Sequence, residues 1–102
     1  MPNRARQKGD RCERALVALH HEAGIPAERI PLSGAMGGSF AGDLRIADTY
    51  TAEVKARKDG AGFKTLEGWL GRNDLLFLRR DRTTPIVVLS WETYIHLMKG
   101  RP

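Results

Sequence analysis

"GDLRIADTYTAEVKARKDG", residues 42–60, shows the clearest periodic pattern in this 102-residue chain. Polar and apolar residues alternate in "DLRIA" and again in "YTAEVKAR", which is typical of two half-buried β-strands. Residues i and i+2 of a strand point to the same side, about 6.6 Å apart. Glu53 and Lys55 therefore share one face of the second strand. The small apolar residues on either side of them form the other face, which we expect to pack against a helix.

Two acids and a lysine are predicted to meet at one place in these strands. Asp43 opens the first strand, and it lies next to Glu53 if the strands pair as a hairpin. Carboxylates held together repel each other unless a cation lies between them. Mg²⁺ takes oxygen ligands and binds through one or two carboxylates together with substrate phosphate. Lys55 adds a positive charge that can orient water or stabilise charge on phosphorus, so the set favours metal-assisted phosphodiester hydrolysis.

A simpler interpretation of the same residues stays open. Glu53 and Lys55 can form an ordinary solvated strand face, where an ion pair contributes little to stability. Asp43 follows Gly42 and can be a turn residue. The pattern Glu-x-Lys alone is common in proteins. The combination of Gly-Asp, Glu-x-Lys in a strand and a Glu in a preceding helix is much less common.

The rest of the chain predicts one α/β domain with the element order α-β-β-β-α-β-β-α. Residues 1–9 are interpreted as a flexible basic arm and residues 10–102 as a single domain. Asp10 is expected to cap a helix that ends at Gly24, and Ser90 to cap a helix over 91–98. The remaining expected elements are a strand at 29–32, a glycine-rich loop at 33–42, a helix at 63–71 and buried strands within 74–80 and 85–90.

Three segments together resemble the PD-(D/E)XK nuclease superfamily, namely "GDRCERALVALHHEAG", "RIPLSGAMGGSFAGDLRI" and "AEVKAR". Within it the chain is most similar to the archaeal-type Holliday junction resolvases and related small phage endonucleases, over roughly residues 9–90. Gly42 stands where the family nominally has proline. The resemblance implies a restriction-endonuclease-like αβββαβ core, with a central mixed sheet flanked by helices.

The resemblance also implies site residues and an activity. Asp43 would be the central metal ligand, with Glu53 and the main-chain carbonyl of Val54 as further ligands. Lys55 would position or activate the water, and Ser33 resembles a catalytic-loop serine. The implied enzyme is a Mg²⁺-dependent endonuclease, with Mn²⁺ as an alternative. It would cut four-way DNA junctions and leave a 5′-phosphate and a 3′-hydroxyl.

Glu13, in the first predicted helix, has two interpretations. Asp10 and Glu13 match a capping box, in which a glutamate three residues into the helix bonds back to the cap residue. The resemblance instead makes Glu13 the outer acid of the site, reaching the metal or its water from the helix. Both interpretations are kept at this point.

The net charge of +5 favours a polyanionic partner, of which nucleic acid is the usual one. No helix-turn-helix or zinc-finger pattern is present, so we expect contacts with backbone phosphates and no base reading. Trp69 falls on an apolar helix face, which favours a core or dimer contact over base stacking. Arg79, Arg80 and Arg82 form a basic cluster after a strand. The residues expected to bind DNA beside the site are Arg4, Arg6, Lys8, Arg11, Arg14, Arg57, Lys58 and Lys64.

Partners and location follow from the remaining features. A domain of this size does not easily hold both strands of a junction, and two-fold dimers are the commonest assembly, so a homodimer is expected. No apolar run approaches the roughly 20 residues of a membrane span. The single cysteine, Cys12, allows no internal disulfide, which fits a cytoplasmic protein. His20, His21 and His96 are expected to be exposed or capping. Alternative functions are a same-fold nuclease acting on flaps, nicks or duplex, a non-enzymatic DNA-binding protein, and a small interaction module.

Overall fold

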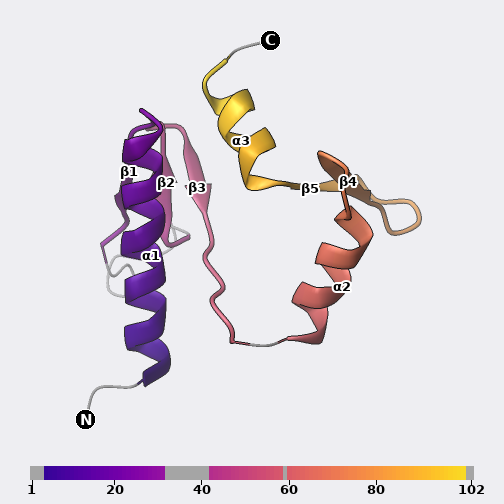
Figure 1. Cartoon of the computed structure of the whole chain (residues 1–102), viewed down its shortest axis with the longest axis horizontal. Coiled ribbons are helices and arrows are strands. Elements are labelled where there is room, and N and C mark those ends of the chain that lie inside the picture. The colour runs from indigo at the N-terminus through magenta and orange to yellow at the C-terminus, as the bar shows by residue number, and fades with distance from the viewer. Residues whose placement is uncertain (1–3, 32–41, 59, 101–102) are drawn as a thin grey trace. The chain divides into compact units, whose positions relative to one another are not determined.

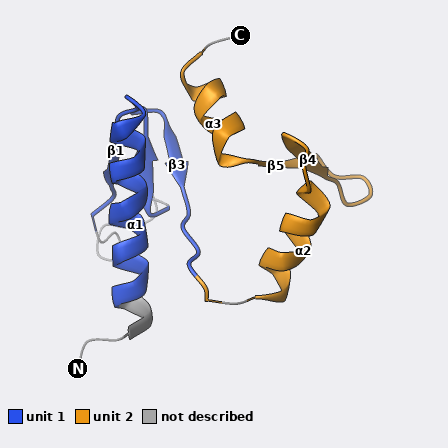
Figure 2. Ribbon diagram, viewed as in Figure 1, with its two compact units in different colours: residues 1–56 blue, residues 57–102 orange. Residues whose placement is uncertain are grey.

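The computed structural model describes residues 4–31, 42–58 and 60–100 and divides into two compact units (Figures 1 and 2). Unit 1 comprises Met1–Ala56 and unit 2 comprises Arg57–Pro102. The described residues form a mixed α/β structure with three helices and two antiparallel sheets. A single central mixed sheet was predicted; each unit instead has an antiparallel sheet of its own, because β4 and β5 pair with each other.

Helix α1 of unit 1 spans Arg4–Glu22 (Figure 1). The predicted start at Asp10, after an arm over 1–9, is wrong for residues 4–9, which are helical. Arginine, alanine, glutamine and lysine are good helix formers, so this segment needs no apolar periodicity to extend the helix. The predicted end at Gly24 is confirmed. Gly24 has φ +80, its N–H donates to the His21 carbonyl, and the Ile25 N–H donates to the His20 carbonyl, as in a Schellman cap.

The sheet of unit 1 has the order β1-β2-β3, with antiparallel neighbours. Strand β1 spans Ala27–Arg29, two residues earlier than predicted, while β2 spans Leu44–Ile46 and β3 spans Tyr50–Ala52. The predicted hairpin between β2 and β3 is confirmed. Its turn places Ala47 at φ 54 and Asp48 at φ 55, and the Thr49 N–H donates to the Ile46 carbonyl at 3.0 Å. Two successive positive φ values are typical of a type I′ hairpin turn.

The core of unit 1 is small. Leu44 is 1% exposed and Ile46 is 3% exposed, because β2 is paired on both sides, and Ile25 after α1 is also buried. His20 is buried as well, and its Nδ1 lies 2.6 Å from the Leu16 carbonyl one helical turn earlier. The prediction that His20 is exposed or capping is therefore wrong, since its ring packs on the inner side of α1. His21 is exposed, as predicted.

Unit 2 contains α2 (Ala61–Leu70), β4 (Leu75–Leu78), β5 (Ile86–Leu89) and α3 (Trp91–Met98) (Figure 1). These elements agree with the sequence prediction in type and order. Strands β4 and β5 form a hairpin in which Leu75 faces Leu89. The hydroxyl of Ser90 accepts a hydrogen bond from the Thr93 N–H at 3.2 Å, which confirms the predicted helix cap.

The strands of unit 2 contain only exposed and half-buried residues, so the prediction of buried strands is wrong. Phe77 is 65% exposed and Ile86 is 63% exposed. No described residue of unit 2 is buried. A run of apolar residues in the sequence does not show whether other parts of the protein cover the strand. A two-stranded hairpin also has no further strand beside either of its edges. Over the described residues, no helix has the length and apolarity needed to cross a membrane.

Candidate active site

Asp43 is held at the start of β2 by three hydrogen bonds. Its N–H donates to the Ala52 carbonyl at 2.7 Å, and its carbonyl accepts from the Ile30 N–H at 2.9 Å. Its carboxylate Oδ2 accepts the Val54 N–H at 2.7 Å. The last bond is the important one, because it fixes the side chain of Asp43 against the segment that contains Glu53 and Lys55. The sequence pattern predicted that these residues lie close together but not this bond.

Gly42 makes this arrangement possible. It has φ +95, a conformation that residues with a side chain rarely adopt. A Cβ atom at this position would lie 3.0 Å from the Ala52 carbonyl oxygen and 3.4 Å from the Thr51 Cβ. Proline, with φ near −65°, does not fit this backbone. The departure from the nuclease pattern at this position therefore has a local physical reason.

The predicted strand over 50–57 is shorter than expected, because β3 ends at Ala52 and Glu53 and Lys55 lie in the segment that follows it. Exposed and half-buried residues alternate from Thr51 to Arg57, which confirms the predicted two faces. The Lys55 Nζ lies 3.6 Å from the Glu53 Oε1, and the two side chains are 62% and 57% exposed. The register that pairs Leu44 with Ala52 places Asp43 beside Glu53 when it is extended by one residue. Two carboxylates and a lysine are thus brought to one edge of the sheet.

Glu13 is held by a residue that the sequence patterns did not identify. The Arg29 Nε donates to the Glu13 Oε1 at 3.0 Å, and its Nη2 donates to the Asp10 Oδ1 at 3.0 Å. The capping-box interpretation is wrong, because α1 begins at Arg4 and Asp10 is not its cap. Arg29 instead joins β1 to α1 through both acids. The acids lie three residues apart in a helix, so they share one side of it, and this spacing is the signal that a cation could lie opposite them.

The carboxylate oxygens of Asp43 and Glu53 suit a magnesium site in which water and substrate supply the other ligands. Among residues 4–31, 42–58 and 60–100, no three acidic, histidine or cysteine side chains are grouped to hold a metal ion. Asp43 and Glu53 supply two carboxylates, and magnesium is commonly bound through one or two carboxylates with water and substrate phosphate as the other ligands. The pair therefore fits such an ion. Ser33 lies outside the described residues, and Glu13 as a further ligand stays a prediction.

Basic side chains occur in both units. Arg11 and Arg14 are exposed on α1, and Lys8 is half-buried. Arg4 and Arg6 belong to the first turns of α1. The other predicted DNA contacts belong to unit 2 and are exposed, namely Arg57, Lys58 and Lys64.

Comparison with protein-family models, with curated proteins and with solved structures finds no match to this chain. The candidate site is therefore defined by its residues alone. Its central observation is that Asp43 is hydrogen-bonded to the segment after β3 that carries Glu53 and Lys55.

Proposed function

We propose that this chain is a metal-dependent endonuclease that hydrolyses phosphodiester bonds in DNA. The hydrogen bond from the Val54 N–H to the Asp43 carboxylate carries the proposal. It holds Asp43 against the segment after β3 that carries Glu53 and Lys55. The bond also fixes the orientation of the Asp43 carboxylate, which a metal ligand requires. The restriction-endonuclease-like fold belongs to the same proposal, with the three-stranded sheet and α1 as its site-bearing part.

Asp43 and Glu53 would hold a Mg²⁺ ion, with the Val54 carbonyl as an additional ligand and Mn²⁺ as a substitute. When bound, such an ion supplies Lewis-acid polarisation of the phosphate and a more acidic water. Lys55 is exposed and lies 3.6 Å from Glu53, so its ammonium group can bind a phosphate oxygen and orient the attacking water. Cleavage of the P–O3′ bond would leave a 5′-phosphate and a 3′-hydroxyl.

A four-way DNA junction is the proposed substrate, cut by a homodimer in the cytoplasm. The net charge of +5 supports a nucleic-acid partner. Exposed Arg11 and Arg14 on α1 are suited to bind backbone phosphates. A dimer would present two sites to the two strands that must both be cut. Flaps, nicks and duplex DNA are the alternative substrates.

Cleavage of labelled DNA tests the proposal. Four-way junction, flap, nicked duplex, intact duplex and single strand are incubated with Mg²⁺, Mn²⁺ or EDTA. Asp43→Asn, Glu53→Gln and Lys55→Ala should each lower the cleavage rate by about a hundredfold or more, since each removes a charge from the site. Glu22→Gln and Lys99→Ala change exposed residues elsewhere and serve as matched controls.

The substrates separate the outcomes. Paired, metal-dependent cuts in the junction alone establish a resolvase. Metal-dependent cutting of every substrate retains the nuclease and removes the junction preference. DNA binding without cleavage in either metal overturns the nuclease proposal. Cleavage that persists in Glu53→Gln and Lys55→Ala assigns the activity to other residues.

A further inference from the structure

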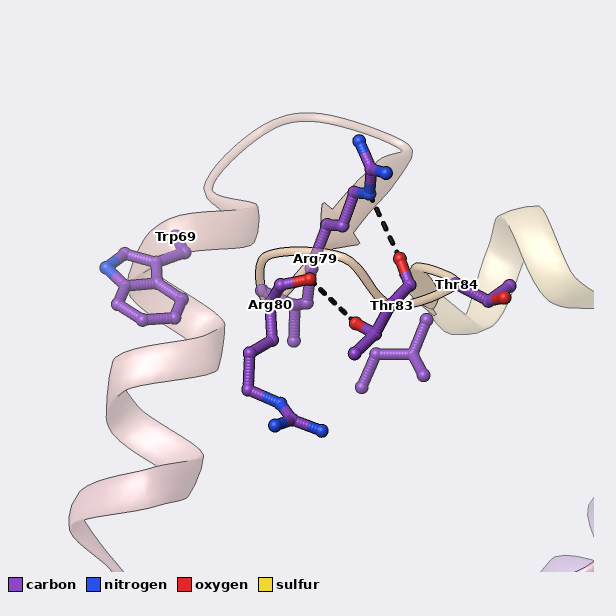
Figure 3. Close-up of a pocket in the computed structure, with 7 residues that line it drawn as sticks. Trp69, Arg79, Arg80, Thr83 and Thr84 are labelled. Carbon is purple, nitrogen blue, oxygen red and sulfur yellow. Dashed lines mark hydrogen bonds between the residues drawn. The ribbon is translucent and has the colours of Figure 1, made fainter.

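Unit 2 contains a hollow of about 550 Å³ at the turn end of the β4–β5 hairpin (Figure 3). The end of α2 contributes Trp69, and the rest of the lining comes from β4, β5 and the turn between them. The lining residues are Trp69, Leu78, Arg79, Arg80, Thr83, Thr84 and Ile86. The volume lies within the range of roughly 300–1,000 Å³ that is usual for sites of small organic molecules.

The turn that forms one wall of this hollow is held by its own hydrogen bonds. The Arg79 Nε donates to the Thr83 carbonyl at 3.0 Å, and the Thr83 hydroxyl donates to the Arg80 carbonyl at 2.7 Å. Both bonds are drawn in Figure 3. Arg82 has φ 64, which completes the tight bend. The guanidinium of Arg79 is thus positioned through its Nε, and its two terminal nitrogens remain able to donate elsewhere.

The lining combines an aromatic ring with positive charge. Trp69 is 60% exposed, so of the predicted core or dimer contact the core contact is wrong, and the dimer contact stays a prediction. Figure 3 shows its indole and the Arg80 side chain among the residues that line the hollow, with the Arg79 guanidinium pointing away from that of Arg80. The lining residues include two arginines and two threonines, and none of them is acidic. Exposed aromatic rings that stack with bases, next to arginines that bind phosphates, are typical of single-strand nucleic-acid sites.

We propose that this hollow binds one unpaired nucleotide of a DNA strand. The Trp69 ring stacks on the base, and Arg80 binds the adjoining phosphate. Leu78 and Ile86 give the hollow an apolar floor. This inference rests on the proposed function in one respect, namely that the nucleic acid bound is DNA. It adds that the preferred DNA has an unpaired nucleotide, which an intact duplex lacks.

Binding in EDTA tests this proposal without cleavage. Fluorescein-labelled oligo-dT and a blunt duplex of equal length are titrated with the protein and followed by fluorescence anisotropy. Trp69→Ala should weaken oligo-dT binding about tenfold. Arg80→Ala should weaken it several-fold and lower the salt slope by about 0.7, the value for one phosphate contact on a single strand. Duplex binding should change by less than about twofold in both variants.

Two further variants guard against a general effect on folding. Trp69→Phe keeps an aromatic ring and should retain part of the affinity that Trp69→Ala loses. Arg72→Ala removes an exposed arginine of the same unit that does not line the hollow, and it should leave oligo-dT binding unchanged. In a Trp91→Phe protein, Trp69 is the remaining tryptophan, and oligo-dT should quench its fluorescence.

Several results would overturn the proposal. Equal affinity of Trp69→Ala, Arg80→Ala and the unchanged protein for oligo-dT excludes the hollow as a nucleotide site. An equal loss on oligo-dT and duplex indicates a general electrostatic surface. A shift of Trp69→Ala from dimer to monomer without a change in oligo-dT affinity indicates a protein interface. Trp69-dependent binding in a protein that cuts no DNA retains this site and rejects the nuclease, so the two proposals fail separately.

Discussion

Unit 1 and unit 2 both place antiparallel strands next to a helix, yet among the described residues only unit 1 buries side chains. In unit 1 the three-residue strand β2 buries Leu44 and Ile46, because it has a neighbouring strand on each side. In unit 2 the longer and more apolar strands of the hairpin contain only exposed and half-buried residues. Apolar content therefore does not by itself bury a strand; in unit 1 burial accompanies a central strand position and falls on one of its two faces.

The largest expected effect tests whether stability is concentrated in unit 1. Leu44→Ala should lower the free energy of unfolding by about 2–5 kcal/mol, because it removes a side chain that is 1% exposed. Phe77→Ala removes a larger side chain that is 65% exposed and should change the same quantity by about 0.5 kcal/mol or less. Urea titration followed by far-ultraviolet circular dichroism measures both values.

If Leu44→Ala and Phe77→Ala lowered the free energy of unfolding equally, the comparison between the units would be contradicted. Such a result would mean that Phe77 is covered in solution. Repeating the titration at several protein concentrations then identifies the cover, since the loss depends on concentration when a second copy supplies it.

The second expected effect concerns two glycines, one in each unit. Replacing them with alanine should change the free energy of unfolding in opposite directions. Gly42→Ala should lower the free energy of unfolding by about 1–3 kcal/mol, because the new side chain meets the Ala52 carbonyl at φ +95. Gly68→Ala lies within α2 with no atom within 4 Å of its Cβ and should raise it by up to about 1 kcal/mol. Thermal unfolding of both proteins measures the difference. A Gly42→Ala protein as stable as the unchanged chain would show that the backbone at the site is not restricted.

The smallest expected effect concerns the ion pair that joins β1 to α1. The Arg29 Nε and the Glu13 Oε1 are 3.0 Å apart, and Glu13 is 16% exposed. A double-mutant cycle with Arg29→Gln and Glu13→Gln should give a coupling free energy of about 0.2–1 kcal/mol at low salt. The coupling should shrink toward zero in about 1 M NaCl. A loss of Mg²⁺ affinity in Glu13→Gln that Arg29→Gln does not share would instead support Glu13 as a metal ligand.

Local patterns predicted those parts of the fold that local physics determines. The hairpin of β2 and β3, the glycine end of α1 and the Ser90 cap each depend on a few neighbouring residues, and all three are confirmed. The start of α1 was not predictable from periodicity, because residues 4–9 have no apolar stripe. The exposure of β4 and β5 was not predictable either, since it depends on what covers them.

The candidate site was predicted in its composition but not in its bonding. Strand alternation placed Asp43 near Glu53 and Lys55, but it did not predict the bond from the Val54 N–H to Asp43. The partner of Glu13 was missed because Arg29 lies 16 residues away in sequence. In addition, Asp10 and Glu13 match a capping box, which already explained Glu13 from its neighbours in sequence. The spacing of Asp10 and Glu13 indicates a cation opposite them, but it does not identify which one, so Arg29 is found from coordinates.

The turn between β2 and β3 limits which insertions and deletions the candidate site can tolerate. Ala47 and Asp48 hold the left-handed conformations that set the length of this turn. Removing or adding one residue there would shift β3 by one position against β2 and exchange its two faces. Glu53 and Lys55 would then point toward the side that Val54 now occupies, and Asp43 would face an apolar neighbour. Related chains with the same chemistry should therefore keep residues that tolerate a positive φ in this turn and change its length only in steps of two residues.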